Sequence, residues 1–215
     1  QREIETILGL ARMMQAYPKI GILQSLVVGM PSRSAFARIF QFGMRHGMRP
    51  YTMGSAWWTA DCGPFWGHNA LVRIVPFRDY CHLPVLPGKP PLGGAVMSHD
   101  QVEATLMRRA GYEVRVLPVE GGSWEENPPT MLDFAKRDLR WCLGNLHYLK
   151  LLDLPGLRPM SRFQLVLAIL MFLGLPACTL MISLLPLAAV QARAVADYPA
   201  VAVVCLYLLF LAMYL

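Results

Sequence analysis

Charged residues are almost absent from the carboxyl-terminal part of this chain. Of the 34 Asp, Glu, Lys and Arg residues, only Arg162, Arg193 and Asp197 lie beyond position 160. Residues 163–191 and 198–215 carry no charge at all. A helix of about 20 apolar residues spans a bilayer core, so we expect two transmembrane helices, at 163–190 and 198–215. Neither is a signal peptide, because both lie far from the amino terminus.

Patterns that bind zinc or nucleic acid are also missing. The five cysteines form no Cys-x-x-Cys pair and the five histidines are scattered, which predicts structural thiols and no zinc site. No basic run is interleaved with aromatic residues, so we expect no nucleic-acid partner. The basic residues instead crowd before the first apolar segment. By the positive-inside rule, the polar part of the chain is expected on the cytoplasmic side of a bilayer.

A loop rich in proline and glycine, residues 87–94, precedes a segment with helical periodicity. Ser98 and Gln101 fit a capping box, and Gly111 stands where a left-handed residue ends many helices. Asp100 then falls in the first helical turn, where the helix dipole favours its ionised form. An ionised carboxylate beside such a loop is a candidate general base. A surface Asp that only stabilises the helix dipole is the alternative.

Helices and buried strands alternate along the polar part, which predicts an α/β fold. Apolar residues recur at helical spacing in three further segments, and two segments have the composition and length of strands. The expected helices are 3–15, 35–46 and 131–149, the expected strands are 20–29 and 112–119, and 121–130 is an expected loop.

Two clusters combine aromatic and polar side chains. Tryptophans and a phenylalanine surround Gly67-His68-Asn69, where Trp66 could stack on a sugar and His68 and Asn69 could bond its hydroxyls. A hydrophobic core corner is the alternative. Arg137, Arg140 and Trp141 share one helix face, which suits a diphosphate or a sugar chain. Anionic lipid headgroups are the alternative for that face.

Three segments in this order resemble family 2 membrane glycosyltransferases. They are FWGHNALVR (65–73), LPGKPPLGGAVMSHDQVEATLMRRAGY (86–112) and KRDLRWCLGNL (136–146). The resemblance covers essentially the whole chain. It is closest to the members that build osmoregulated periplasmic glucans in Gram-negative bacteria.

The resemblance implies roles for particular residues. Asp100 stands in place of the catalytic Asp of a Thr-Glu-Asp triplet, which here reads Ser-His-Asp. The family motif Gln-x-x-Arg-Trp reads Arg137-Asp-Leu-Arg140-Trp141, so the hydrogen-bonding role of its Gln is not carried over. Trp141 would form a platform under the acceptor sugar. Trp66, His68 and Asn69 would line the acceptor entrance.

The implied fold is a partial GT-A (Rossmann-like) domain followed by two transmembrane helices. Residues 1–150 would be the acceptor-side half of a cytoplasmic glycosyltransferase domain, and 151–162 an interfacial linker. The Asp-x-Asp motif that holds a divalent metal in this family occurs nowhere in this sequence. We therefore expect no metal ligand here, Mg or Mn in the full-length enzyme, and a fragment that is inactive alone.

The implied activity is that of a membrane-embedded inverting β-glucosyltransferase. It would transfer glucose from UDP-glucose to a growing β-glucan at the Gram-negative inner membrane, as a multi-pass protein with a cytoplasmic catalytic domain. The expected partners are UDP-glucose, the β-glucan acceptor, the lipid bilayer and a periplasmic glucan-processing protein. The alternatives are another family 2 polysaccharide or glycolipid synthase, or a non-catalytic, membrane-anchored, transferase-like regulator.

Overall fold

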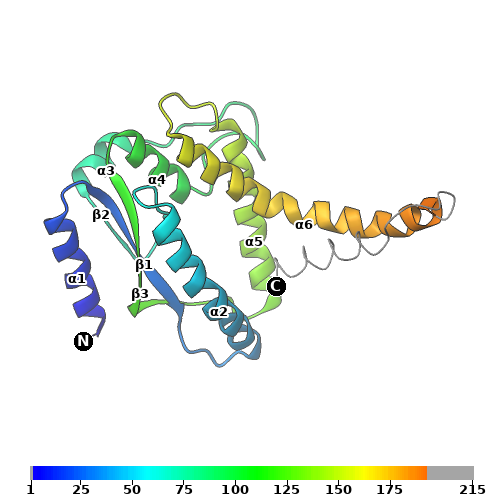
Figure 1. The fold of residues 1–215 in the computed structure, drawn as a ribbon, viewed down its shortest axis with the longest axis horizontal. Coiled ribbons are helices and arrows are strands. Elements are labelled where there is room, and N and C mark those ends of the chain that lie inside the picture. Colours follow the sequence, from blue (N-terminus) through cyan, green and yellow to red (C-terminus); the bar gives the residue numbers. More distant parts are fainter. Residues whose placement is uncertain (1, 193–215) are drawn as a thin grey trace. The chain divides into compact units, whose positions relative to one another are not determined.

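The computed structural model describes residues 2–192 (Figure 1). Its elements in chain order are α1 (Arg2–Ala16), β1 (Ile20–Gly29), α2 (Ala35–Trp58), β2 (Ala70–Val72), α3 (Ile74–Tyr80), α4 (Asp100–Arg109), β3 (Glu113–Glu125), α5 (Met131–Leu146), the 3₁₀ helix η1 (His147–Lys150) and α6 (Pro159–Ala192). The chain divides into two compact units, residues 1–170 and residues 171–215.

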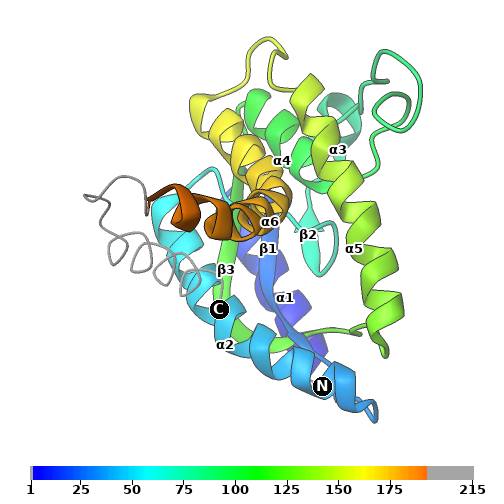
Figure 2. The same ribbon diagram turned by 90° about the vertical axis from the view of Figure 1, so that its right-hand side faces the viewer.

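A three-stranded mixed sheet organises the first unit, with the strand order β2-β1-β3. The central strand β1 is antiparallel to β2 and parallel to β3. Figures 1 and 2 show α1 on one side of this sheet and α2 on the other. A strand covered on both faces needs a nearly continuous apolar run, and β1 has one. The expected α/β class and the expected strand at 20–29 are confirmed.

The two faces of β1 belong to different hydrophobic clusters, because successive side chains of a strand point in opposite directions. Leu23 packs with Leu10 and Met14 of α1. Ile22 packs on the opposite face, in a larger cluster with Val102 and Leu106 of α4. That cluster also contains Val114, Tyr148, Leu151, Leu165 and Ile169. Each such fully buried aliphatic side chain contributes about 1.5–3 kcal/mol, so both faces stabilise the unit.

The start of α4 differs from the expected capping box. Asp100 does lie in the first turn, as expected, but His99 is the N-cap residue, and no side chain bonds the free N–H groups. A tertiary contact holds the residue before the N-cap: the phenolic hydroxyl of Tyr148 donates to the Ser98 carbonyl, at 3.0 Å. Gly111 has φ +92°, so the expected left-handed residue at the other end is confirmed.

Two elements are longer than their sequence patterns predict. α2 continues through Pro50 to Trp58. Pro50 lies on the exposed side, where water can bond the carbonyl that loses its N–H partner. β3 continues to Glu125, through half of the expected loop. Gly121 and Gly122 fall where the β1–β3 register shifts, and bulges of this kind tolerate glycine. The short elements β2 and α3 were not expected.

The first turns of α6 belong to the core of the first unit, where Leu165 and Ile169 are buried. Phe163 meets Trp58, at the end of α2, edge to face with ring centroids 6.2 Å apart. Among the described residues, one helix, Pro159–Ile182, is long and apolar enough to cross a membrane. The second expected span, 198–215, lies outside the described residues.

The second unit is described through residue 192 as the continuation of α6. Its described leucines include Leu173, Leu175 and Leu180, which are all exposed.

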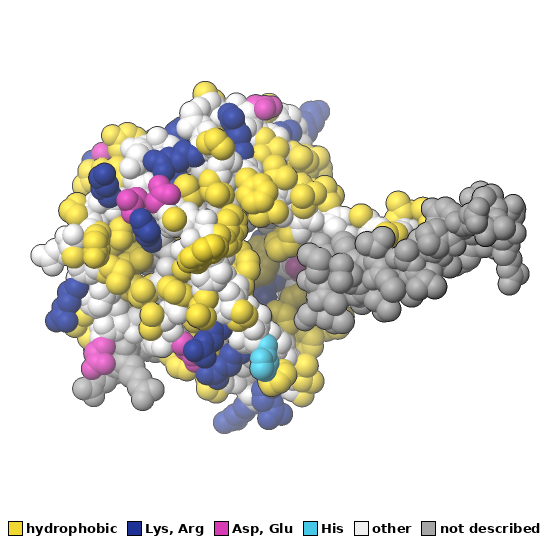
Figure 3. Space-filling view, viewed as in Figure 1, with side chains coloured by type: hydrophobic (Ala, Val, Ile, Leu, Met, Phe, Trp, Pro, Cys, Tyr) yellow, Lys and Arg dark blue, Asp and Glu magenta, His cyan; other side chains and the backbone are white. Residues whose placement is uncertain are grey.

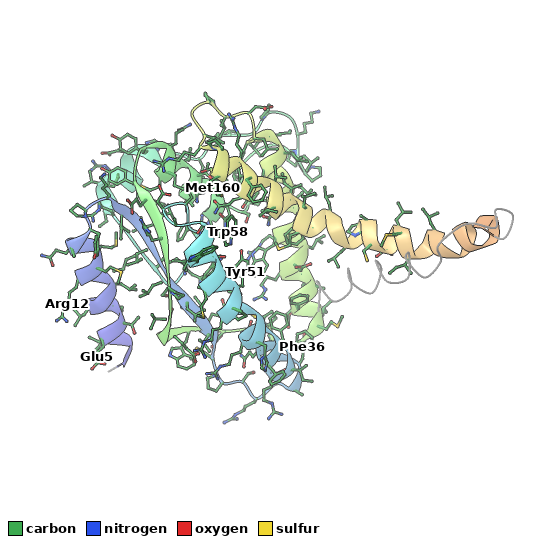
Figure 4. The ribbon with its side chains drawn as sticks, viewed as in Figure 1. Glu5, Arg12, Phe36, Tyr51, Trp58 and Met160 are labelled. Carbon is green, nitrogen blue, oxygen red and sulfur yellow. The ribbon has the colours of Figure 1, made fainter. Side chains whose placement is uncertain are left out.

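The aromatic residues of α2 divide between two surroundings. Phe40 packs against Phe134 of α5, with ring centroids 5.1 Å apart, and Phe36 lies beside both (Figure 4). Ile39, in contrast, is 74% exposed. Hydrophobic side chains cover much of the surface in Figure 3. The apolar side chains of α2 are therefore only partly in contact with α5.

Candidate active site

Three segments distant in the sequence line one pocket of about 310 Å³. The first is the turn before β2, the second is the approach to α4, and the third is one turn of α5. The lining residues are Trp66, Gly67, His68, Met97, Ser98, His99, Asp100, Arg140 and Trp141. A pocket of this size can hold a small polar ligand. Both aromatic and ionisable side chains face it.

The turn before β2 is held in place by a buried amide. The side chain of Gln24, on β1, is fully buried. Its Oε1 accepts the backbone N–H of Trp66, at 3.0 Å. Its Nε2 donates to the His68 carbonyl, also at 3.0 Å. The same Nε2 also contacts the carbonyls of Asn69 and of its own neighbour Ser25. A buried amide that bonds two backbone groups of one turn holds that turn in place, so β1 positions the Trp66–His68 side of the pocket.

Asn69 lies outside the pocket lining. Its side-chain amide donates to Ser123 Oγ and to the Trp124 carbonyl, both at 2.9 Å. Its backbone has φ +51°, a conformation that Asn tolerates better than most residues. In this structure Asn69 ties the start of β2 to β3.

Gly67 brings the backbone against the carboxylate of Asp100. A Cβ atom placed on Gly67 would lie 2.9 Å from Asp100 Oδ1, closer than real Cβ contacts. Gly67 also has φ +79°, a region that residues with a side chain rarely adopt. Both constraints select glycine at this position.

His99 lies between two carboxylates at the start of α4. Its Nδ1 is 3.1 Å from Glu103 Oε2 and 3.5 Å from Asp100 Oδ1. Partial burial alone would lower the pKa of His99, but the Glu103 carboxylate, assisted by Asp100, raises it above the ordinary value. Burial raises the pKa of Glu103, although His99 opposes that shift. The two carboxylates thus favour the protonated form of His99 beside the candidate base.

α5 contributes the opposite wall through Arg140 and Trp141. Arg137, one turn earlier, does not line the pocket. Its guanidinium carbon lies 4.5 Å from the ring centroid of Trp141, and less than 6 Å from those of Phe40 and Phe134. Such cation–π contacts are worth about 0.5–2 kcal/mol each. Arg137 therefore supports the Trp141 ring from outside the pocket.

Gly144 allows α5 to pack against the approach to α4. A Cβ atom on Gly144 would lie 2.5 Å from Ser98 Cβ and 2.8 Å from its backbone nitrogen. The backbone nitrogen cannot move aside cheaply, because Tyr148 holds the carbonyl of the same residue. The spacing between the two walls of the pocket depends on this glycine.

We expect Gly144→Ala to lower the melting temperature of the full-length protein by several degrees. The steric cost of the close contact with Ser98 should exceed the free energy gained from the higher helix propensity of Ala. Gly43→Ala is the matched control: Gly43 is also helical, and no atom lies within 4 Å of its added Cβ. There the higher helix propensity of Ala should stabilise by about 1 kcal/mol. Thermal unfolding of the detergent-solubilised variants measures both. A melting temperature unchanged or raised in Gly144→Ala would contradict the packing argument.

Among residues 2–192, no group of three His, Cys, Asp or Glu side chains is arranged to hold a metal ion. The Mg or Mn expected for the full-length enzyme stays a prediction.

The structure brings together most of the expected site residues. Asp100, Trp66, His68, Arg140 and Trp141 line the same pocket, whereas Asn69 and Arg137 do not. Trp57 and Trp58, from the tryptophan-rich stretch before Gly67, lie at the end of α2 and are not among the lining residues.

Sequence reasoning missed His99, Met97 and Gln24. The Ser-His-Asp triplet was a signal for His99, since it puts a titratable ring next to the candidate base. No sequence pattern singled out Met97 or Gln24.

Comparisons with known proteins point to one family. The sequence model described as "Glycosyl transferase family group 2" matches residues 5–215. The protein named "Glucans biosynthesis glucosyltransferase H" from Caulobacter vibrioides (strain NA1000 / CB15N) is 45% identical over 168 residues, which cover 78% of this chain and 25% of that relative. The protein of the same name from Rhodopseudomonas palustris (strain BisA53) is 43% identical over 172 residues, covering 80% and 24%.

A third relative of that name, from Shewanella baltica (strain OS155), is 44% identical over 174 residues, which cover 81% of this chain and 24% of the relative. The chain therefore spans about a quarter of the length of the curated relatives that it matches.

Proposed function

Because this chain belongs to glycosyl transferase family group 2, we propose that it is the acceptor-side part of a membrane-embedded, inverting β-glucosyltransferase that extends a glucan with glucose from UDP-glucose. The family match confirms the resemblance seen in the three motif segments, and with the mixed α/β sheet it supports a GT-A-like fold. The single observation that carries the proposal is the pocket that joins Asp100 to Trp66, His68, Arg140 and Trp141.

In the proposed reaction, a hydroxyl of the glucan attacks the anomeric carbon of the donor glucose. The new C–O bond forms as the bond to the diphosphate breaks, and the electron pair of the broken bond leaves on the β-phosphate oxygen. The hydroxyl proton passes to Asp100, whose side chain is 27% exposed and so can reach a bound sugar. A base within hydrogen-bond reach of that proton is what this step requires. The products are UDP and a glucan one residue longer.

The other lining residues bind and orient the acceptor in this proposal. Trp66 and Trp141 offer ring faces on which a sugar can stack. His68 and Arg140 donate hydrogen bonds to hydroxyls or to a developing phosphate charge. Asn69 and Arg137, which the resemblance also implicates, act from outside the pocket, the first through the turn before β2 and the second through Trp141.

The surroundings of the reaction follow from the same proposal. Residues 1–150 form the acceptor-side half of a cytoplasmic domain, and residues 151–162 form the linker at the membrane surface. The apolar helix that begins at Pro159 is the first of at least two spans in the bacterial inner membrane. The UDP-binding half and its divalent metal belong to parts of the protein beyond this chain. A glucan-processing protein on the periplasmic side completes the list of proposed partners.

The test uses membranes from cells that produce the full-length protein, with membranes from cells lacking it as control. Labelled UDP-glucose is supplied, and the polymer formed is digested with β-glucanases. We expect label in a polymer that β-glucanase degrades, together with release of UDP. Label from UDP-N-acetylglucosamine or UDP-galactose, but not from UDP-glucose, would favour another family 2 synthase. Transfer from none of the three donors would favour a non-catalytic, membrane-anchored regulator.

A further inference from the structure

One imidazole faces two carboxylates at the edge of the pocket. His99 Nδ1 is 3.1 Å from Glu103 Oε2 and 3.5 Å from Asp100 Oδ1. All three side chains come from the first turn of α4 or its N-cap. Helical spacing places Glu103 one turn from His99, on the same face. The backbone of this first turn therefore holds His99, Asp100 and Glu103 near one another.

The two carboxylates differ in their access to the pocket. Asp100 and His99 line it, with 27% and 47% of their side chains exposed. Glu103 is not among the lining residues, and its side chain is only 12% exposed. A bound sugar can touch Asp100 and His99, whereas Glu103 influences the pocket through the His99 ring.

We propose that His99 and Glu103 are positioning residues for Asp100: the Glu103 carboxylate holds the His99 ring in place, and the charge of that ring sets how readily Asp100 accepts the proton of the acceptor hydroxyl. This inference rests on the proposed function, in which Asp100 is the base.

The two neighbours act on Asp100 in opposite directions. A positive charge within about 4–6 Å stabilises a carboxylate and makes its protonation less favourable, whereas a negative charge makes protonation more favourable. In the acidic range where carboxylates titrate, His99 holds its proton, because Glu103 raises the pKa of the ring. The positive charge of His99 therefore favours the charged form of a carboxylate beside it, and the negative charge of Glu103 opposes this.

Other titratable or charged groups lie near His99, Asp100 and Glu103, and the same groups are present in the wild type and in the variants. His68 and Arg140 line the pocket from the turn before β2 and from α5. Burial raises the pKa of Cys81, which lies against Glu103, to about 12, and it also raises the pKa of Tyr148. Both are neutral over the range of interest. None of these groups is changed in the variants below.

The first experiment measures kcat/KM for glucose transfer from UDP-glucose against pH, with the full-length protein in membranes. In His99→Gln the loss of the positive charge should shift the acidic limb of the kcat/KM profile to higher pH, by about one pH unit. In Glu103→Gln the loss of the negative charge should shift that limb to lower pH. A purely structural role would lower the rate at every pH and leave the limb in place. Limbs that stay unmoved, or that move in the same direction, would overturn the proposal.

His99→Arg provides a rescue that is independent of Glu103. Arg keeps its positive charge throughout the pH range, so the limb should return toward its wild-type position. This comparison keeps the proposal testable even if the Glu103 variant does not accumulate. The proposal would be contradicted if the acidic limb of His99→Arg lay at the same high pH as that of His99→Gln.

A second readout does not depend on transfer. Diethyl pyrocarbonate modifies neutral imidazole, so the pH dependence of His99 modification, followed by mass spectrometry, reports its protonation. Glu103→Gln should lower the midpoint for His99, while the exposed His46 on α2 serves as the unchanged internal reference. An unchanged His99 midpoint would refute the pairing. Wild-type membranes without any transfer would contradict the proposed function, whereas unmoved limbs in active variants would contradict only the positioning role.

Discussion

Replacing Asp100 by Asn in the full-length protein should lower glucose transfer from UDP-glucose by about 100-fold or more, which is the scale expected when a general base is removed. Asn keeps the size of the side chain and can still form hydrogen bonds, but it cannot take up the acceptor proton. The measurement is incorporation of labelled glucose by membranes containing equal amounts of each variant. Retention of UDP binding would locate the loss in the chemical step.

The matched control for this substitution is Asp79→Asn. Asp79 lies on the surface at the end of α3, where its carboxylate pairs with the neighbouring Arg78. An exposed pair of this kind contributes little, so transfer should stay within about twofold of wild type. Near-normal transfer by Asp100→Asn would reduce Asp100 to a residue that stabilises the helix dipole. The general base would then have to be another acid.

Gly67→Ala should abolish most transfer while leaving the fold intact. The added methyl group would lie 2.9 Å from Asp100 Oδ1, so either the carboxylate or the turn must move. A displacement of about 1 Å at a reacting group can cost on the order of 100-fold in rate. The substitution also forces Ala to φ +79°, at a cost of about 1–2 kcal/mol. We expect a loss of about 100-fold in kcat, measured as for Asp100→Asn.

Gly111→Ala separates the two effects of the Gly67 substitution. Gly111 has φ +92° at the end of α4, but no atom lies within 4 Å of its added Cβ. It should therefore show a similar loss of thermal stability and much less loss of transfer per folded molecule. Equal losses of transfer in the two variants would mean that backbone strain, and not contact with Asp100, explains the effect at Gly67.

Local sequence patterns predicted several parts of this protein correctly. The apolar run of β1 matches its strand, and helical periodicity identified α1 and α5, although α5 gives way to the 3₁₀ helix η1 at His147. The uncharged stretch after Arg162 lies within the helix α6. Asp100 occupies the first turn of α4, as its place after the Pro/Gly loop indicated. These features depend on neighbouring residues, whose propensities and spacing are written in the sequence itself.

Patterns failed where distant residues override local preference. The capping box at Ser98 does not form, and that residue's carbonyl accepts a hydrogen bond from Tyr148, 50 positions away. α2 passes through Pro50, where water on the exposed side can bond the freed carbonyl. β3 passes through two glycines at a shift in its pairing with β1. The roles of Asn69 and Arg137 outside the pocket also depend on partners far away in the chain.

The motif segments, the family, the apolar helix and the candidate base could thus be identified from the order of residues alone. Which side chains meet in one pocket was decided only by the tertiary structure. Gln24 sets the position of the Trp66 turn, Gly67 allows it to touch Asp100, and Gly144 lets α5 approach from the other side. Each of these contacts joins residues tens of positions apart. A sequence pattern reports neighbours along the chain, whereas burial and close packing select neighbours in space.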